Sequence, residues 1–122
     1  MPAYKDFEDL PVWRAAQALA IRVYQLTAGR AFQAEFALRD QLRRSALSIA
    51  SNIAEGFERG TKKEFAQFLR VARGSAGELR SQLSLAGALG YLKSEEAEAE
   101  KQVCRDICRQ LTAFAASLRQ AK

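Results

Sequence analysis

The chain has 122 residues, of which 19 are lysine or arginine and 14 are aspartate or glutamate, so its formal net charge is +5 and its isoelectric point lies near 9.6. The absence of histidine excludes catalytic pairs of serine or cysteine with histidine, and it removes the commonest general base and metal ligand. The length fits one domain, residues 1–122, and the acidic amino terminus without a long apolar stretch predicts a cytoplasmic protein that does not enter a membrane.

Four segments space their apolar residues three and four positions apart, and none alternates apolar and polar residues, so the chain is predicted to be all-α. The first helix is expected over residues 11–28, because Pro11 suits a first helical position and Gly29 favours a stop. The second helix is expected over residues 35–57, and Gly60 ends it.

The remaining two helices are expected over residues 62–90 and 95–119. Thr61 and Glu64 have capping-box spacing, in which each side chain bonds the backbone N–H of the other residue, and Ser94 is expected to cap the fourth helix. Because the connections are short, the four helices are predicted to form an antiparallel up-down bundle.

The third helix carries a regular apolar seam, with steps of three and four residues, which is typical of a helix packed antiparallel against its neighbours. Gly74 and Gly77 lie inside this helix, where small residues are expected to allow the close approach of another helix. The predicted seam consists of Phe65, Phe68, Ala72, Ser75, Leu79, Gln82, Ala86 and Leu89.

Polar side chains border the apolar faces of the second and third helices, at positions that a bundle buries in part. We interpret them as a polar layer that fixes helix register or forms part of a subunit interface. Arg44 is near enough in sequence to pair with one of the carboxylates. The strips are Gln41, Ser48, Asn52 and Glu55 on the second helix and Ser75, Glu78 and Gln82 on the third. The candidate layer or interface residues are Arg44, Asn52, Glu55, Ser75, Glu78 and Gln82.

Glu55 and Glu78 allow a second interpretation, as the acid and base of an active site or as ligands of a hard cation. The helical bundles that hold two metal ions take their ligands from repeated Glu-x-x-His motifs, and this chain has no histidine. We therefore expect no catalytic residue, no metal and no cofactor, and we keep the carboxylate site as an alternative.

A basic arc on the third helix spans roughly 100° of the helical projection, and we expect it opposite the apolar seam, facing solvent. Its members are Lys62, Lys63, Arg70, Arg73 and Arg80. Further basic outer surface is expected from Arg39 and Arg43 on the second helix and from Lys101, Arg105 and Arg109 on the fourth. Such a surface could bind phosphates with release of counter-ions, although charge alone is also typical of a solvated helix face.

Cys104 and Cys108 lie one turn apart on the predicted core face of the fourth helix. We expect them to pack as small apolar residues, because two thiols alone do not complete a zinc site. A metal-ligand pair completed by another subunit, or a redox pair, is the alternative.

Four strings between Phe7 and Leu92 carry a resemblance to a known family: FEDLPVWRAAQALA, EFALRDQLRRSALSIASNIAEGFERG, EFAQFLRVARGSAGELRSQL and ALGYL. In combination they resemble the four-helix-bundle family first named for proteins encoded in intervening sequences of bacterial 23S ribosomal RNA genes. The resemblance implies a bundle that assembles into a ring-like homopentamer, with no known enzymatic activity and no catalytic residues. A related branch is similar to the accessory proteins of diversity-generating retroelements, which bind a reverse transcriptase and nucleic acid.

The positions that match the family motifs are expected to define the bundle or its subunit contacts. They are Asn52, Glu55, Gly56, Gly74, Ser75, Glu78 and Gln82. The expected function is that of a non-enzymatic oligomer whose basic surface binds structured RNA or another nucleic acid. The alternative is a protein-binding scaffold, such as a reverse-transcriptase partner. The candidate phosphate contacts are Arg39, Arg43, Lys62, Lys63, Arg70, Arg73 and Arg80.

Overall fold

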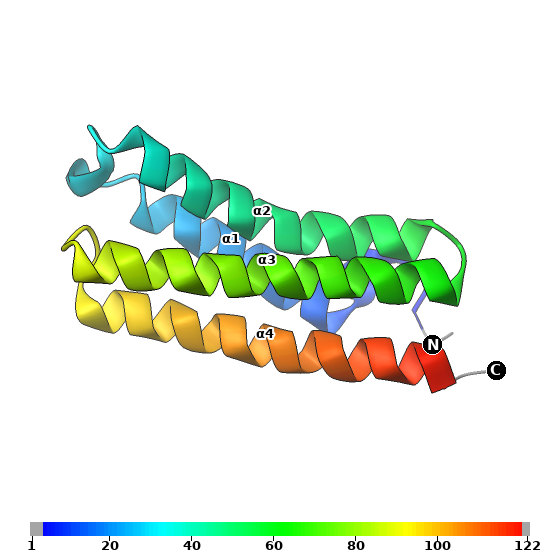
Figure 1. Cartoon of the computed structure of the whole chain (residues 1–122). Helices are drawn as coiled ribbons and strands as arrows, with labels where there is room; N and C mark the ends of the chain where they lie inside the picture. Colours follow the sequence, from blue (N-terminus) through cyan, green and yellow to red (C-terminus); the bar gives the residue numbers. More distant parts are fainter. Residues whose placement is uncertain (1–3, 121–122) are drawn as a thin grey trace.

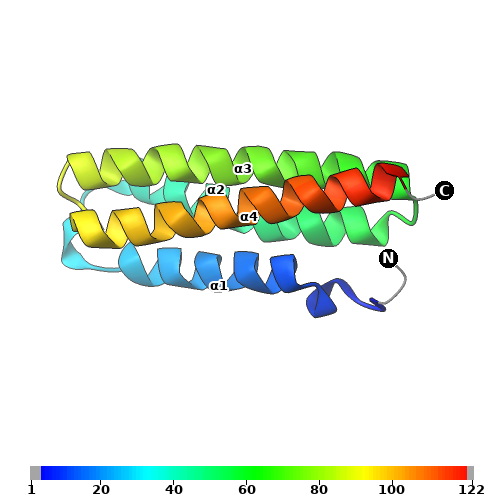
Figure 2. The same cartoon turned by 90° about the horizontal axis from the view of Figure 1, so that it is seen from below.

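The computed structural model describes residues 4–120, apart from the side chain of Gln120, and in this range it contains four long helices and no strand. The helices run alternately in opposite directions and lie side by side (Figures 1 and 2), so the all-α prediction is confirmed and the arrangement is that of a four-helix bundle. The elements are η1 (Phe7–Asp9), α1 (Pro11–Leu26), η2 (Arg30–Phe32), α2 (Phe36–Glu58), α3 (Lys62–Ala88) and α4 (Ser94–Gln120).

Glycines in left-handed backbone conformation end α2 and α3. Gly60 has a φ of 92° and Gly90 a φ of 84°, values that residues with a Cβ rarely adopt. After α3, the backbone N–H of Tyr91 donates to the carbonyl of Ala86 at 2.9 Å, which closes a Schellman turn. α3 therefore ends at Ala88, two residues before the predicted end, and leads directly into the turn before α4.

The helix starts follow the predicted capping residues only in part. The backbone N–H of Glu64 donates to Thr61 Oγ1 at 3.1 Å as predicted, but the Glu64 carboxylate accepts from the Thr61 hydroxyl rather than from its backbone. The prediction that Ser94 caps the fourth helix is wrong, because Ser94 is already helical. The N–H of Lys93 instead donates to Glu96 Oε1 at 3.1 Å, so a glutamate side chain caps α4 from within its first turn.

The core is broader on α3 than the sequence pattern indicates, because α3 packs against both α2 and α4 (Figure 1). A second buried row continues its apolar face toward α4 and consists of Ala66, Leu69, Ala76 and Leu83. At the other edge, Leu89 was predicted to lie in the seam, but it follows the last helical turn and is exposed. The apolar face of α3 is therefore rotated toward α4 relative to the prediction.

Gly56 is the glycine that allows the close approach of α2 and α3. A Cβ at this position would lie 2.6 Å from the Cβ of Phe68 and 2.9 Å from a ring carbon of Phe65. The prediction that Gly74 and Gly77 serve this purpose is wrong within one chain, because a Cβ at either position would meet nothing within 4 Å. Gly74 is exposed, and Gly77 borders an open depression between α3 and α4.

An ion pair that the sequence pattern did not reveal joins α1 to α4. The Arg22 Nε donates to both carboxylate oxygens of Glu100 at 3.0 Å, and Glu100 is only 8% exposed.

No helix within residues 4–120 has the length and apolar character that crossing a membrane requires.

Candidate nucleic-acid interface

The five cations of the basic arc are exposed to solvent as predicted, but three of them, Arg70, Arg73 and Arg80, line the groove between α3 and α4 instead of lying opposite the apolar face. Arg70 and Arg73 line one stretch of this groove together with Thr112 and Arg119 of α4. The predicted apolar face consisted of one seam of residues. The second buried row widens that face toward α4, so the arginines border it instead of lying opposite it. The arc therefore flanks a helix–helix groove with side chains on both sides.

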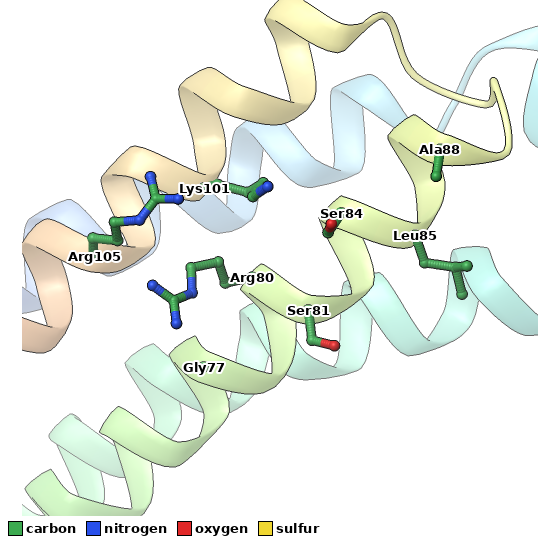
Figure 3. Close-up of a pocket in the computed structure, with 8 residues that line it drawn as sticks. All are labelled: Gly77, Arg80, Ser81, Ser84, Leu85, Ala88, Lys101 and Arg105. Atoms are coloured by element: carbon green, nitrogen blue, oxygen red, sulfur yellow. The ribbon is translucent and has the colours of Figure 1, made fainter.

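A second stretch of the same groove lies closer to the turn that joins α3 to α4. Arg80 of α3 and Lys101 and Arg105 of α4 line it, and their nitrogen-bearing ends project into the space between the two helices (Figure 3). Ser84 lies on the same side of α3 (Figure 3). Three cationic side chains from two helices thus share one open depression.

The cations of the α3 arc have no carboxylate partners in the part of the chain that the structure describes. Arg73 donates a hydrogen bond to Thr112 Oγ1 at 3.1 Å, which is a neutral partner. By contrast, Arg14, Arg59 and Arg109 elsewhere on the surface each form an ion pair with aspartate or glutamate. Positive charge without a nearby carboxylate produces an attractive potential for anions. The unpaired residues of the arc are Lys62, Lys63, Arg70, Arg73 and Arg80.

Glu98 is the carboxylate that approaches the α4 side of the groove. Its two oxygens lie 3.3 Å from Lys101 Nζ and 3.6 Å from an Arg105 guanidinium nitrogen. The hydrogen bond and the charge of Lys101, followed by the charge of Arg105, lower the pKa of Glu98. Glu98 is therefore anionic at neutral pH and neutralises part of this charge.

Two other candidate phosphate contacts, Arg39 and Arg43, are not brought together with the α3 arc. Arg39 pairs with Asp40 at 3.3 Å. Arg43 donates from Nε to Thr27 Oγ1 at 2.8 Å and stacks over the Tyr24 ring, with 4.6 Å from the guanidinium carbon to the ring centre. Arg43 thus belongs to the α1–α2 side of the bundle and is largely engaged in packing, whereas the contacts of Arg39, with Asp40 and the Phe36 ring, lie within α2.

Lys62 and Lys63 lie in the first turn of α3, at the end of the bundle where α4 finishes (Figure 1). They are therefore nearer to Arg70 than to Arg80 along the helix. Arg119 and Thr112 of α4 belong to the same end of the groove and were not predicted as site residues. Their signal in the sequence is a spacing of seven residues from Arg105 through Thr112 to Arg119, which places all three on one helix face.

The predicted polar layer between α2 and α3 is centred on two serines. Ser48 Oγ and Ser75 Oγ are 2.8 Å apart, and Asn52 Nδ2 donates to the Ser48 carbonyl and hydroxyl at 2.8 and 2.9 Å. Ser45, which was not among the predicted layer residues, donates to Glu78 Oε1 at 3.5 Å. The layer is thus formed by hydroxyl, amide and carboxylate groups from both helices.

Three of the predicted layer residues take little part in these bonds. Glu55 is exposed and pairs with Arg59, and Arg44 is exposed without an ion pair among residues 4–120. Gln82 is half-buried, and its buried Oε1 atom has no hydrogen-bond partner among residues 4–120.

Glu55 and Glu78 do not form a common carboxylate site within one chain. Glu78 contacts Ser45, which precedes Glu55 by ten positions on α2, and ten helical residues span about 15 Å. The described residues contain no cluster of three or more cysteine, aspartate or glutamate side chains placed to bind a metal ion.

The two cysteines are free thiols on the core side of α4, and Cys104 is completely buried. Burial raises the pKa of Cys104 from its ordinary value of 9.0 to about 12, and Cys108 and Glu100 add to this rise. Burial also raises the pKa of Cys108, whose thiol donates to the Arg73 carbonyl at 3.7 Å. Both thiols are therefore poor nucleophiles at neutral pH.

The raised pKa of Cys104 predicts a loss of stability at alkaline pH. Above pH 9 the thiol ionises in the unfolded chain but stays protonated in the fold up to about pH 12, so the unfolded state binds fewer protons in this window. This thiol should then lower the free energy of unfolding by up to about 1.4 kcal/mol per pH unit. Urea unfolding under reducing conditions should show the wild type losing more stability than Cys104→Ala between pH 9 and pH 12. A parallel decline of the two proteins would contradict the prediction.

The fold and this surface define a class of protein: a small four-helix bundle whose last two helices share a groove lined by cations. The chain belongs to the 23S rRNA-intervening sequence protein family, whose family model matches residues 8–113. The resemblance seen in the sequence is thereby confirmed.

A solved structure supports the same assignment. The chain is similar to a protein with unknown function from the S23 ribosomal protein family of Bacteroides thetaiotaomicron, with 25% identity and a TM-score of 0.78. The similarity covers 85% of this chain and 97% of that chain. No curated protein matches the chain.

Proposed function

We propose that this protein is a non-enzymatic, cytoplasmic, bacterial oligomer that binds structured RNA through the α3–α4 groove and the adjoining basic arc. The observation that supports this function is that the five cations of the arc have no carboxylate partner within residues 4–120. Three of them, Arg70, Arg73 and Arg80, line the groove together with cations from α4. Phosphate groups that approach such a surface release their condensed counter-ions, which favours binding.

Several observations favour a binding role over an enzymatic one. The sequence lacks histidine, and the carboxylates that could act as acid and base, Glu55 and Glu78, lie far apart along the bundle. Both thiols are kept protonated by burial. The basic groove, by contrast, has a clear preference for anionic ligands, which suits a binding role.

The apolar outer side of α3 supports self-association, and we include a homopentamer in the proposal. Val71, Leu85 and Leu89 are each about half exposed although they are large and apolar. Leu47 adds to the exposed apolar surface on α2. Exposed apolar side chains on neighbouring helices are typical of a protein contact surface. The polar layer beside this surface, with Ser48, would then contribute to subunit contacts.

The same apolar surface supports a second candidate function, that of a scaffold for another protein. A reverse transcriptase is the partner that the family resemblance suggests. A heterologous partner would cover Val71 and Leu89 in place of a second copy of the chain, while the basic groove, which Leu85 borders, would stay available to nucleic acid carried by that partner.

Binding to a structured RNA hairpin across a salt series tests the proposed function. Wild-type affinity should fall steeply as salt rises, and Arg70→Glu with Arg73→Glu should weaken binding by more than about tenfold and reduce the salt slope by about 1.5 to 2. Fluorescence anisotropy measures the affinity. Light scattering in the same buffers should give a mass of five chains, each of 13.5 kDa.

The matched control is Arg14→Glu with Arg30→Glu, which changes the net charge by the same amount on α1 and η2. Both side chains are exposed and lie outside the α3–α4 groove. If the control weakens binding as much as the groove variant, net charge rather than the groove determines affinity, and the proposal is wrong. A wild-type protein that does not bind the hairpin at moderate salt would also refute it.

A further inference from the structure

The groove between α3 and α4 has an open depression with a volume of about 660 Å³ near the α3–α4 turn. This volume lies within the range of about 300 to 1,000 Å³ that is usual for small-molecule sites. Figure 3 shows that Arg80 enters it from α3, whereas Lys101 and Arg105 enter it from α4. The backbone of α3 leaves room at Gly77, where a Cβ would meet nothing within 4 Å.

The charges around this depression already hold one oxyanion. The Glu98 carboxylate lies within 4 Å of both Lys101 and Arg105, so these two side chains are spaced to share a pair of anionic oxygens. Arg80, on the facing helix, forms no ion pair among the described residues. Three cations and one carboxylate leave a formal charge of +2 at the depression.

We propose that the Arg80–Lys101–Arg105 depression is a binding site for a terminal phosphate group, with Ser84 as a hydroxyl donor and Glu98 as an internal competitor for the α4 cations. A phosphate monoester carries a charge of about −1.5 to −2 at neutral pH, which matches the charge of the site better than the single charge of a phosphodiester. Guanidinium groups bind such a group through paired, charge-assisted hydrogen bonds.

The phosphate could belong to the 5′ end of an RNA or to a free nucleotide, since both present the same group. The assignment to an RNA end rests on the proposed function, whereas the site itself does not. At the other stretch of the groove, Arg70, Arg73 and Arg119 would hold internal phosphodiesters of a bound RNA. The depression would then bind the 5′ end of the RNA, and the remaining cations of the arc would bind the RNA backbone.

Two pairs of ligands test the site and separate the two sources of phosphate. The first pair is one RNA oligonucleotide with a 5′-phosphate or a 5′-hydroxyl, measured by anisotropy of a 3′ label. The second is adenosine monophosphate against adenosine, measured by calorimetry. We expect the phosphorylated member of at least one pair to bind about tenfold more tightly to the wild type. A preference in the first pair alone assigns the site to RNA ends, and one in the second pair alone assigns it to nucleotides.

Variants of the depression identify where the phosphate binds. Arg80→Gln and Lys101→Gln should each abolish the preference for the phosphorylated ligand, and Glu98→Gln should strengthen it about threefold by removing the competing carboxylate. Arg14→Gln on α1 is the control and should keep the wild-type preference. Circular dichroism and thermal unfolding check that the variants are folded.

Failure of this inference can be told apart from failure of the proposed function. If both members of each pair bind the wild type equally, the terminal-phosphate site is refuted, while tight binding of the 5′-hydroxyl RNA would leave RNA binding intact. If Arg80→Gln and Lys101→Gln keep the preference for the phosphorylated ligand, the phosphate binds outside the depression, and the proposed site is refuted. If no RNA binds, the nucleotide pair alone decides the inference in either direction.

Discussion

Arg22→Met is expected to lower the free energy of unfolding by about 3 kcal/mol, because it leaves the Glu100 carboxylate buried without its partner. The loss should lie at the lower end of the range for broken buried ion pairs, since the Arg22 side chain is 39% exposed and water reaches its side of the pair. The pair also connects the first helix to the last. Urea unfolding followed by circular dichroism at neutral pH measures the change.

The double variant Arg22→Met with Glu100→Leu serves as the control for this prediction. Replacing both charges with apolar side chains removes the unpaired carboxylate, so it should recover most of the stability that the single variant loses. A double variant as unstable as Arg22→Met alone would show that packing of the arginine stem, rather than the buried charge, accounts for the loss. A loss below about 0.5 kcal/mol in Arg22→Met would contradict the prediction, because it is the size expected of a surface pair.

Gly56→Ala should destabilise the fold by about 1 to 3 kcal/mol, although alanine is the better helix former. The added methyl group would lie 2.6 Å from the Cβ of Phe68, an atom fixed to the backbone of α3, so the two helices must separate to accommodate it. Separation would also weaken the edge-to-face contact between Phe57 and Phe65. The midpoint of thermal or urea unfolding measures the effect.

Gly74→Ala is the matched control, since it makes the same chemical change within a helix where a Cβ meets nothing within 4 Å. It should stabilise the chain by about 0.5 to 1 kcal/mol through the lower conformational entropy of the unfolded state. Opposite signs for the two substitutions would support the packing described for α2 and α3. Equal stabilisation at both positions would mean that the helices adapt to the methyl group without cost.

The fold could be predicted from local patterns because each helix carries its own apolar periodicity and its own stop. Gly60 and Gly90 indicated two turns, and both adopt the left-handed conformation that makes glycine favourable there. The buried width of α3 could not be predicted in the same way. It depends on a helix having neighbours on two sides, and the alanines that extend it, such as Ala66 and Ala76, give little signal of burial in a sequence.

The residues of the candidate site could be predicted from the sequence, but their arrangement in space could not. The arginines of α3 were evident from charge, whereas their position beside Lys101 and Arg105 depends on how α3 and α4 are aligned. The alignment of two helices is a property of tertiary packing and leaves no trace in the periodicity of either one. For the same reason the Arg22–Glu100 pair, 78 residues apart in sequence, was missed.

The short turn between α3 and α4 and the packing beside it set how the two helices are aligned along the groove. Gly90 fixes its conformation, and close packing holds the two helices in register beside it, since a Cβ at Gly87 would lie 3.1 Å from the Cβ of Ala97. Inserting one residue within α4, between Ala97 and Lys101, would turn the rest of the helix by about 100° and would carry Lys101 and Arg105 away from Arg80. Relatives that retain a shared groove are thus expected to keep the number of residues between this contact and the cations of α4, whereas the residue types in between are free to vary.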